Sequence, residues 1–166
     1  MLMLFWYRSN AYQRVYLREM QWLENDFADS CDFELIGLSS HLPPQRLCWE
    51  LNRSMGWELE FSHLLDISQK GGKSSHAVYR FNETVDAGPY AFHVVENKLP
   101  EGIIARFQGA SALDYLIHLG EGCEHANGLL PSLRSVMGVN YVQILDPLHS
   151  GAIEHLALID LAPLSD

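Results

Sequence analysis

Residues 32–56 read DFELIGLSSHLPPQRLCWELNRSMG, and this stretch decides the fold prediction. Its first part, residues 32–39, is short and mostly apolar, which is typical of a buried strand. The two prolines end that strand, and Pro44 suits the first position of a helix because its missing N–H would have no partner there. The apolar residues that follow recur every four positions, which predicts a helix: Leu47, Leu51 and Met55.

The rest of the chain predicts more strands and one further helix. Strand-like runs occupy residues 57–67, 77–82, 90–96, 103–108, 112–118, 139–145 and 155–161, and the apolar side of residues 129–137 predicts a short helix. Most of these strands are joined by short turns, and residues 69–75 are expected to form a loop. We therefore predict an α+β fold: one mainly antiparallel sheet of about six strands, with two or three helices packed on one face.

Length and charge limit the function classes. The chain has 166 residues, and its 11 Lys and Arg against 21 Asp and Glu give a net charge of −10. This length predicts one domain at residues 24–166 after an N-terminal extension at 1–23, helical or flexible, with Met20 as an alternative start. The acidic balance disfavours nucleic acid and anionic lipid as partners. No apolar run approaches the roughly 20 residues of a membrane span, so we expect no membrane partner.

Cysteine usage predicts the compartment. Cys31, Cys48 and Cys123 are too few and too scattered for a disulfide framework, which is typical of a protein in the reducing cytoplasm. Cys48 lies among apolar residues of the predicted helix, where a cysteine is usually a small buried hydrophobic residue. We expect a cytoplasmic protein.

The sequence contains no motif for catalysis or for binding a nucleotide. It lacks the GxxxxGK[ST] and GxGxxG patterns and the GxSxG elbow. The run from Gly71 to Ser74 lacks the first glycine of a phosphate loop and is expected to be an ordinary loop. We expect no catalytic residue, no metal and no cofactor, which argues against an enzyme.

The turn between the first strand and the first helix is the candidate site. Its polar residues are Ser39, Ser40, His41, Arg46 and Asn52. Such residues can bind an anion, because free N–H groups and the helix dipole converge at a helix N-terminus. They can equally serve as helix caps and loop hydrogen bonds, which is the favoured interpretation. Arg46 is also expected to pair with Asp114, since a carboxylate in an apolar strand either faces solvent or is paired.

The same stretch resembles the start of an uncharacterised bacterial family, chiefly of the Bacteroidota, named for its IPExxxVDY signature. That family has a strand ending in Ser-Ser-His and an Arg-Leu-Cys-Trp helix with an Asn, and the matching residues are Ser39, Ser40, His41, Arg46, Leu47, Cys48, Trp49 and Asn52. Weaker matches are an Asn-Lys turn, the VDY half of the signature and a closing Asp-Pro turn, at residues 97–98, 113–115 and 144–147.

The IPE half of the signature is not matched. At the expected place, with three residues between it and Leu113, the chain has Phe107, Gln108 and Gly109. The similar letters Leu-Pro-Glu at 99–101 are separated from Leu113 by eleven residues. The resemblance therefore implies a divergent member of a family without an established activity. It also favours a structural role for the signature residues.

These observations predict a small cytoplasmic accessory or protein-interaction domain without its own catalysis. One alternative is a small-ligand or anion-binding protein, or an enzyme, with its site at residues 39–52. A second alternative is a self-assembling homodimer, formed by an exposed strand edge or by the N-terminal segment. The expected partner is thus an unidentified protein or a second copy of the chain.

Overall fold

The computed structural model describes residues 33–69, 72–85, 88–107, 113–120 and 125–149, together with residues 155, 156 and 159. In chain order, its elements are β1 (Glu34–Ser40), α2 (Pro44–Met55), β2 (Glu60–Gln69), β3 (Gly72–Val85), β4 (Gly88–Glu96), β5 (Tyr115–Leu119), α3 (Ala126–Arg134), β6 (Val139–Leu145) and the 3-10 turn η1 (Pro147–His149). The extension predicted at 1–23, Met20, Cys31 and Cys123 lie outside the described residues.

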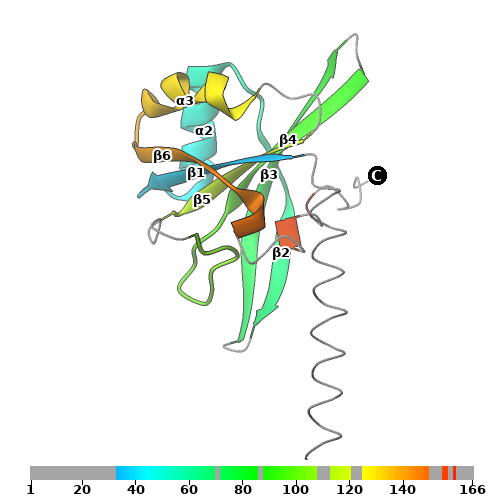
Figure 1. Ribbon diagram of the computed structural model, residues 1–166, viewed down its shortest axis with the longest axis vertical. Helices are drawn as coiled ribbons and strands as arrows, with labels where there is room; N and C mark the ends of the chain where they lie inside the picture. The colour runs from blue at the N-terminus through cyan, green and yellow to red at the C-terminus, as the bar shows by residue number, and fades with distance from the viewer. Residues whose placement is uncertain are drawn as a thin grey trace, which may run out of the picture. The chain divides into compact units, whose positions relative to one another are not determined.

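The six strands form one antiparallel sheet in the order β2-β3-β4-β5-β1-β6 (Figure 1). β1 lies between β5 and β6, so that Leu35 is opposite His118 on one side and Leu145 on the other. β2 and β6 are the two edge strands of this sheet. The predicted α+β fold is confirmed.

Both helices pack on one face of the sheet, where they build the larger core (Figure 1). Leu47, Cys48 and Leu51 line α2 at helical spacing, and Leu129 and Leu133 do the same on α3. The strands meet them with every second residue, as the alternation of a pleated sheet requires; these include Ile36, Leu38, Val94 and Ile117. Cys48 is 3% exposed, which confirms that it is a buried residue of this core, and burial raises the pKa of its thiol to about 12.

The opposite face of the sheet is also buried. Ile104, Ala105 and Phe107 belong to the segment between β4 and β5 and join a second core. That core also contains Leu35, Val78, Val95, Leu116, Leu145, Leu156 and Ile159. Burial on two faces explains why the middle of β1, residues 35–38, has no polar side chain.

The structure corrects two predicted strands and one loop. The predicted strand at 103–108 does not form over its described residues, 103–107: an isolated bridge joins Lys98 to Ile103, and the amide side chain of Asn97 binds both the N–H and the carbonyl of Ala105. Of residues 155–161, positions 155 and 156 are helical and 159 is in a 3-10 turn. The predicted loop at 69–75 is shorter, because the β2–β3 ladder continues to Gln69 and Gly72.

Two glycines allow close packing. A Cβ on Gly37 would lie 2.6 Å from Leu113 Cδ1 and 2.9 Å from Leu145 Cδ1, so β1 needs a glycine beneath these two buried side chains. Gly138 ends the turn between α3 and β6 with a φ of +83°, and a Cβ there would lie 2.3 Å from Leu42 Cδ1.

Gly138→Ala is expected to lower the free energy of unfolding by about 2–4 kcal/mol, because strain from the positive φ adds to the clash with Leu42. The matched control is Gly56→Ala at the C-cap of α2. Gly56 has a φ of +70° and nothing within 4 Å of its Cβ position, so this variant loses only about 1–2 kcal/mol. Urea unfolding measures the free energy of unfolding of both variants. Equal losses would contradict the close packing of Leu42 against Gly138.

Candidate functional site

The turn after β1 is held by the carboxylate of Asp114, which immediately precedes β5. One oxygen of that carboxylate accepts hydrogen bonds from the Ser39 hydroxyl at 3.0 Å and from the Ser40 N–H at 2.9 Å. The backbone of Asp114 takes part as well: its N–H donates to the Leu38 carbonyl, and its carbonyl accepts from the Asn97 N–H at 2.8 Å. Asp114 thus connects β1, β5 and the end of β4.

Ser40 and Tyr115 complete these contacts. The Ser40 hydroxyl donates to the Gly138 carbonyl at 2.7 Å and accepts from the Leu42 N–H at 3.2 Å. The Tyr115 hydroxyl donates to the Leu42 carbonyl at 2.5 Å. We call this set the Asp114 joint; its residues are Ser39, Ser40, Leu42, Asp114, Tyr115 and Gly138.

Helix capping takes a different form from the one expected. The N-cap of α2 is Pro43, which supplies no side-chain hydrogen bond to the helix. Ser39 and Ser40 instead bind groups of the Asp114 joint, and His41 is exposed. Their hydroxyls therefore make loop hydrogen bonds within the protein, and no bound anion is needed to satisfy them.

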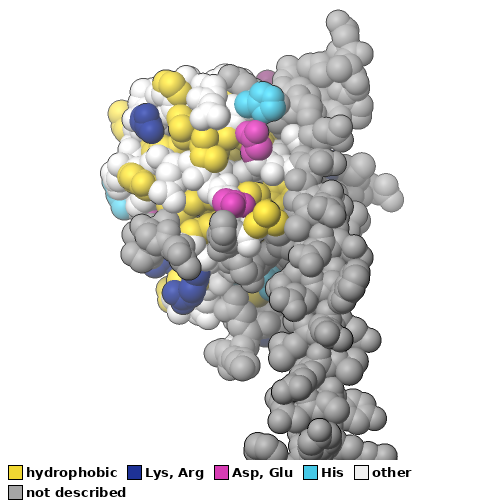
Figure 2. All heavy atoms as spheres, in the orientation of Figure 1, with side chains coloured by type: hydrophobic (Ala, Val, Ile, Leu, Met, Phe, Trp, Pro, Cys, Tyr) yellow, Lys and Arg dark blue, Asp and Glu magenta, His cyan; other side chains and the backbone are white. Residues whose placement is uncertain are grey.

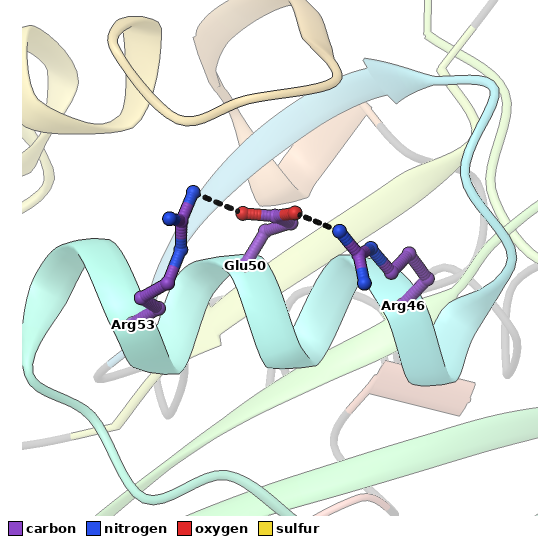
Figure 3. A network of polar contacts seen from close by, with 3 residues as sticks. All are labelled: Arg46, Glu50 and Arg53. Atoms are coloured by element: carbon purple, nitrogen blue, oxygen red, sulfur yellow. Dashed lines mark hydrogen bonds and ion pairs between the residues drawn. The ribbon is translucent and has the colours of Figure 1, made fainter.

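Arg46 does not pair with Asp114, so that prediction is wrong. Its guanidinium binds Glu50 Oε1 at 2.7 Å, and Arg53 binds Glu50 Oε2 at 2.8 Å (Figure 3). Glu50 lies four residues after Arg46 on the same helix, where the two side chains meet without any tertiary constraint. The Glu50 side chain is 1% exposed, while both arginine side chains are about half exposed.

Asn52 is separate from the Asp114 joint. Its side-chain amide donates to the Leu59 carbonyl at 3.1 Å, and its oxygen accepts from the Leu59 N–H at 2.8 Å. This pair of bonds closes the connection between α2 and β2. Of the five predicted site residues, the structure therefore brings only Ser39 and Ser40 together in one set of hydrogen bonds.

Sequence analysis missed a set of buried imidazoles on the sheet face opposite the helices. His93 and His118 are 1% and 0% exposed and lie opposite each other on β4 and β5, with ring centroids 5.7 Å apart. Arg80 continues the row on β3, opposite His93, and the ring centroids of Phe33 and His118 lie 4.4 Å apart. We call Arg80, His93 and His118 the histidine row. The sequence does carry a signal for this placement. Each of the three lies two residues from a buried Val or Leu of its own strand, and residues two apart on a strand face the same side of the sheet.

The interior keeps the His93 imidazole neutral. Burial is the main cause, and the neighbouring His118, Arg80 and His63 add to it, so that together they lower the pKa of His93 to about 3. Burial also lowers the pKa of His76, whose two ring nitrogens contact the Ser74 hydroxyl and the Glu96 carbonyl, each at 2.8 Å. Within the described ranges, no three His, Cys, Asp or Glu side chains are grouped to hold a metal ion.

Comparison of the chain with protein-family models, with curated proteins and with solved structures finds no match. The resemblance to the IPExxxVDY family therefore stays a prediction. Neither α2 nor α3, the helices of the described part, is long and apolar enough to cross a membrane.

Asp114→Ala should lower the free energy of unfolding by about 1–3 kcal/mol, because two donors at the Asp114 joint lose their acceptor. A double-mutant cycle with Ser39→Ala should give a coupling energy of about 0.5–1.5 kcal/mol. The control cycle pairs Asp114→Ala with Arg46→Ala and should give a coupling below about 0.5 kcal/mol. Urea unfolding supplies all the values, and strong coupling to Arg46 would contradict the described contacts.

On acidification, the free energy of unfolding should begin to fall at pH values above the range in which carboxylates titrate. An unfolded histidine titrates near pH 6.5, so below about that pH the unfolded chain binds a proton that folded His93 does not. The stabilisation present at pH 7 is thus lost as the pH falls from about 6.5 towards 3, by at most about 1.4 kcal/mol per pH unit for this group. By contrast, the lowered pKa of Glu34 affects the free energy of unfolding only in the more acidic pH range in which carboxylates titrate.

Urea unfolding at a series of pH values between about 7.5 and 4.5 measures this slope. His93→Gln should make the slope shallower, whereas the same substitution at the exposed His41 should leave it unchanged. A free energy of unfolding that stays constant from pH 7 to pH 5 would contradict the conclusion that His93 stays neutral in the folded protein.

Proposed function

We propose that this chain is a protein-interaction domain without catalysis of its own, and that it self-associates through the outer edge of β6. The observation that supports this is the character of that strand. Val139–Leu145 contains no charged residue, and it exposes Tyr141 (52%) and Ile144 (40%). Among the described strands β6 pairs with β1 alone, which leaves the backbone groups of its other side available for pairing.

The other edge of the sheet is protected. β2 also exposes large apolar side chains, Phe61 and Leu64, but it carries the exposed carboxylates Glu60 and Asp66 as well. Charged side chains on an edge strand oppose pairing with another strand, because pairing would desolvate them and bring like charges together. The two edges therefore differ in charge rather than in apolar content, and β6 is the edge suited to association.

A second copy of the chain fits this edge. In an antiparallel pair centred on Val142, Tyr141 lies opposite Gln143 of the other copy and no charged side chains meet. Met137 and Leu148, before and after β6, are 62% and 57% exposed and add apolar surface. Figure 2 shows hydrophobic side chains at the surface on the side where β6 lies in Figure 1.

Net charge favours the same surface. Two molecules of charge −10 repel each other, so an uncharged strand is where their approach costs least. The residues of the Asp114 joint are satisfied internally, whereas the backbone of an edge strand gains hydrogen bonds when another strand pairs with it.

The full chain should form a dimer of twice 18.8 kDa as its concentration rises through the micromolar range, measured by light scattering after gel filtration. The variant Tyr141→Lys with Ile144→Lys should remain a monomer, because charges on the edge strand oppose pairing. The matched control is Phe61→Lys with Leu64→Lys on β2, which should dimerise like the wild type. A wild-type monomer at every concentration, or equal losses in the two variants, would overturn the proposal.

A further inference from the structure

The outer face of α2 carries an exposed tryptophan with an arginine on either side along the helix. Trp49 is 50% exposed, and the guanidinium carbons of Arg46 and Arg53 lie 4.4 and 5.2 Å from the centre of its ring. We call these three residues the arginine–tryptophan face. Arginine and tryptophan are enriched among the residues that dominate binding energy at protein interfaces.

Both arginines are held in place before any partner arrives. Each arginine uses one guanidinium nitrogen for an ion pair with the carboxylate of Glu50, which lies between the two and is 1% exposed (Figure 3). A guanidinium has five N–H donors in a fixed plane, so donors remain on the half-exposed part of each side chain. Because the side chains are already ordered, binding would cost little conformational entropy.

The charge of the helix layer is opposite to that of the chain. α2 and α3 together contain Arg46, Arg53 and Arg134 against Glu50, which gives a local net charge of 3 − 1 = +2. The whole chain carries −10. Since Glu50 is buried, the charges this layer presents to solvent are those of its arginines.

We propose that the arginine–tryptophan face docks an acidic segment of a partner protein, with carboxylates on Arg46 and Arg53 and an apolar side chain on Trp49. Bidentate pairing of guanidinium with carboxylate provides the polar contacts, and the indole provides apolar area at the centre. A nucleic acid is the less suitable partner, because a long polyanion experiences the repulsion of the whole acidic chain. This docking does not depend on the β6 edge, which lies on a different element.

The test starts with a library of random twelve-residue peptides displayed on phage and selected on the full-length protein. The comparison variant combines Arg46→Gln, Glu50→Gln and Arg53→Gln, so that no buried carboxylate is left unpaired. It changes the net charge by −2 + 1 = −1. The matched control is Arg106→Gln, which removes one exposed charge outside α2 and also changes the net charge by −1. Circular dichroism and thermal unfolding establish that each variant is folded.

Selected peptides should be rich in Asp and Glu around an aromatic or aliphatic residue. By fluorescence anisotropy, they should bind the wild type and the Arg106→Gln control alike, and bind the triple variant about tenfold or more weakly. Trp49→Ser, which leaves both arginines and Glu50 in place, should weaken binding by a similar factor. Higher salt should also weaken binding, because the contacts are ionic and partly exposed.

Three results would overturn this proposal. The selection could yield peptides without an acidic bias, or acidic peptides that bind the triple variant as well as the wild type. A labelled single-stranded oligonucleotide could also bind the wild type more tightly than the selected peptides and lose that binding in the triple variant, which would make this face a nucleic-acid site. Because the variants for the β6 edge are separate, none of these results bears on dimer formation.

Discussion

The carboxylate of Asp114 holds the place where the end of β1, the start of β5 and the end of β4 come together. Its side chain fixes Ser39 and Ser40, and its backbone binds Leu38 and Asn97. A carboxylate that accepts several hydrogen bonds at once is more restrictive than an apolar contact, because each bond specifies a direction as well as a distance. These contacts join β1 to β5 at the end of their ladder, directly before the turn that leads into α2.

The parts of the fold that local periodicity determines could be predicted from sequence. β6 was predicted at its observed bounds, and β1 and α2 to within one or two residues, since apolar spacing alone identifies them. The predicted Arg46–Asp114 pair does not form, because Glu50, four residues after Arg46 on the same helix, is the nearer partner. The strand predicted at 103–108 failed for a tertiary reason, namely the Asn97 amide that binds the Ala105 backbone.

The histidine row shows what periodicity cannot provide. Arg80, His93 and His118 come from three strands, and only the ladder register places them opposite one another. Each strand alone indicates which face a residue occupies, but which residues become neighbours depends on the register between strands. The interior of this domain thus combines an apolar core beneath the helices with a face on which buried imidazoles are part of the packing.

The unequal protection of the two sheet edges also determines how far an assembly can grow. A sheet with two edges that can pair adds copies without limit and forms a fibre. A sheet with one such edge has no further edge for pairing once two copies meet about a two-fold axis. Here the exposed carboxylates of Glu60 and Asp66 oppose pairing at β2, whereas β6 has no charged side chain. The proposed pairing through β6 would therefore close at two copies, with the acidic edge facing outward at both ends of the combined sheet.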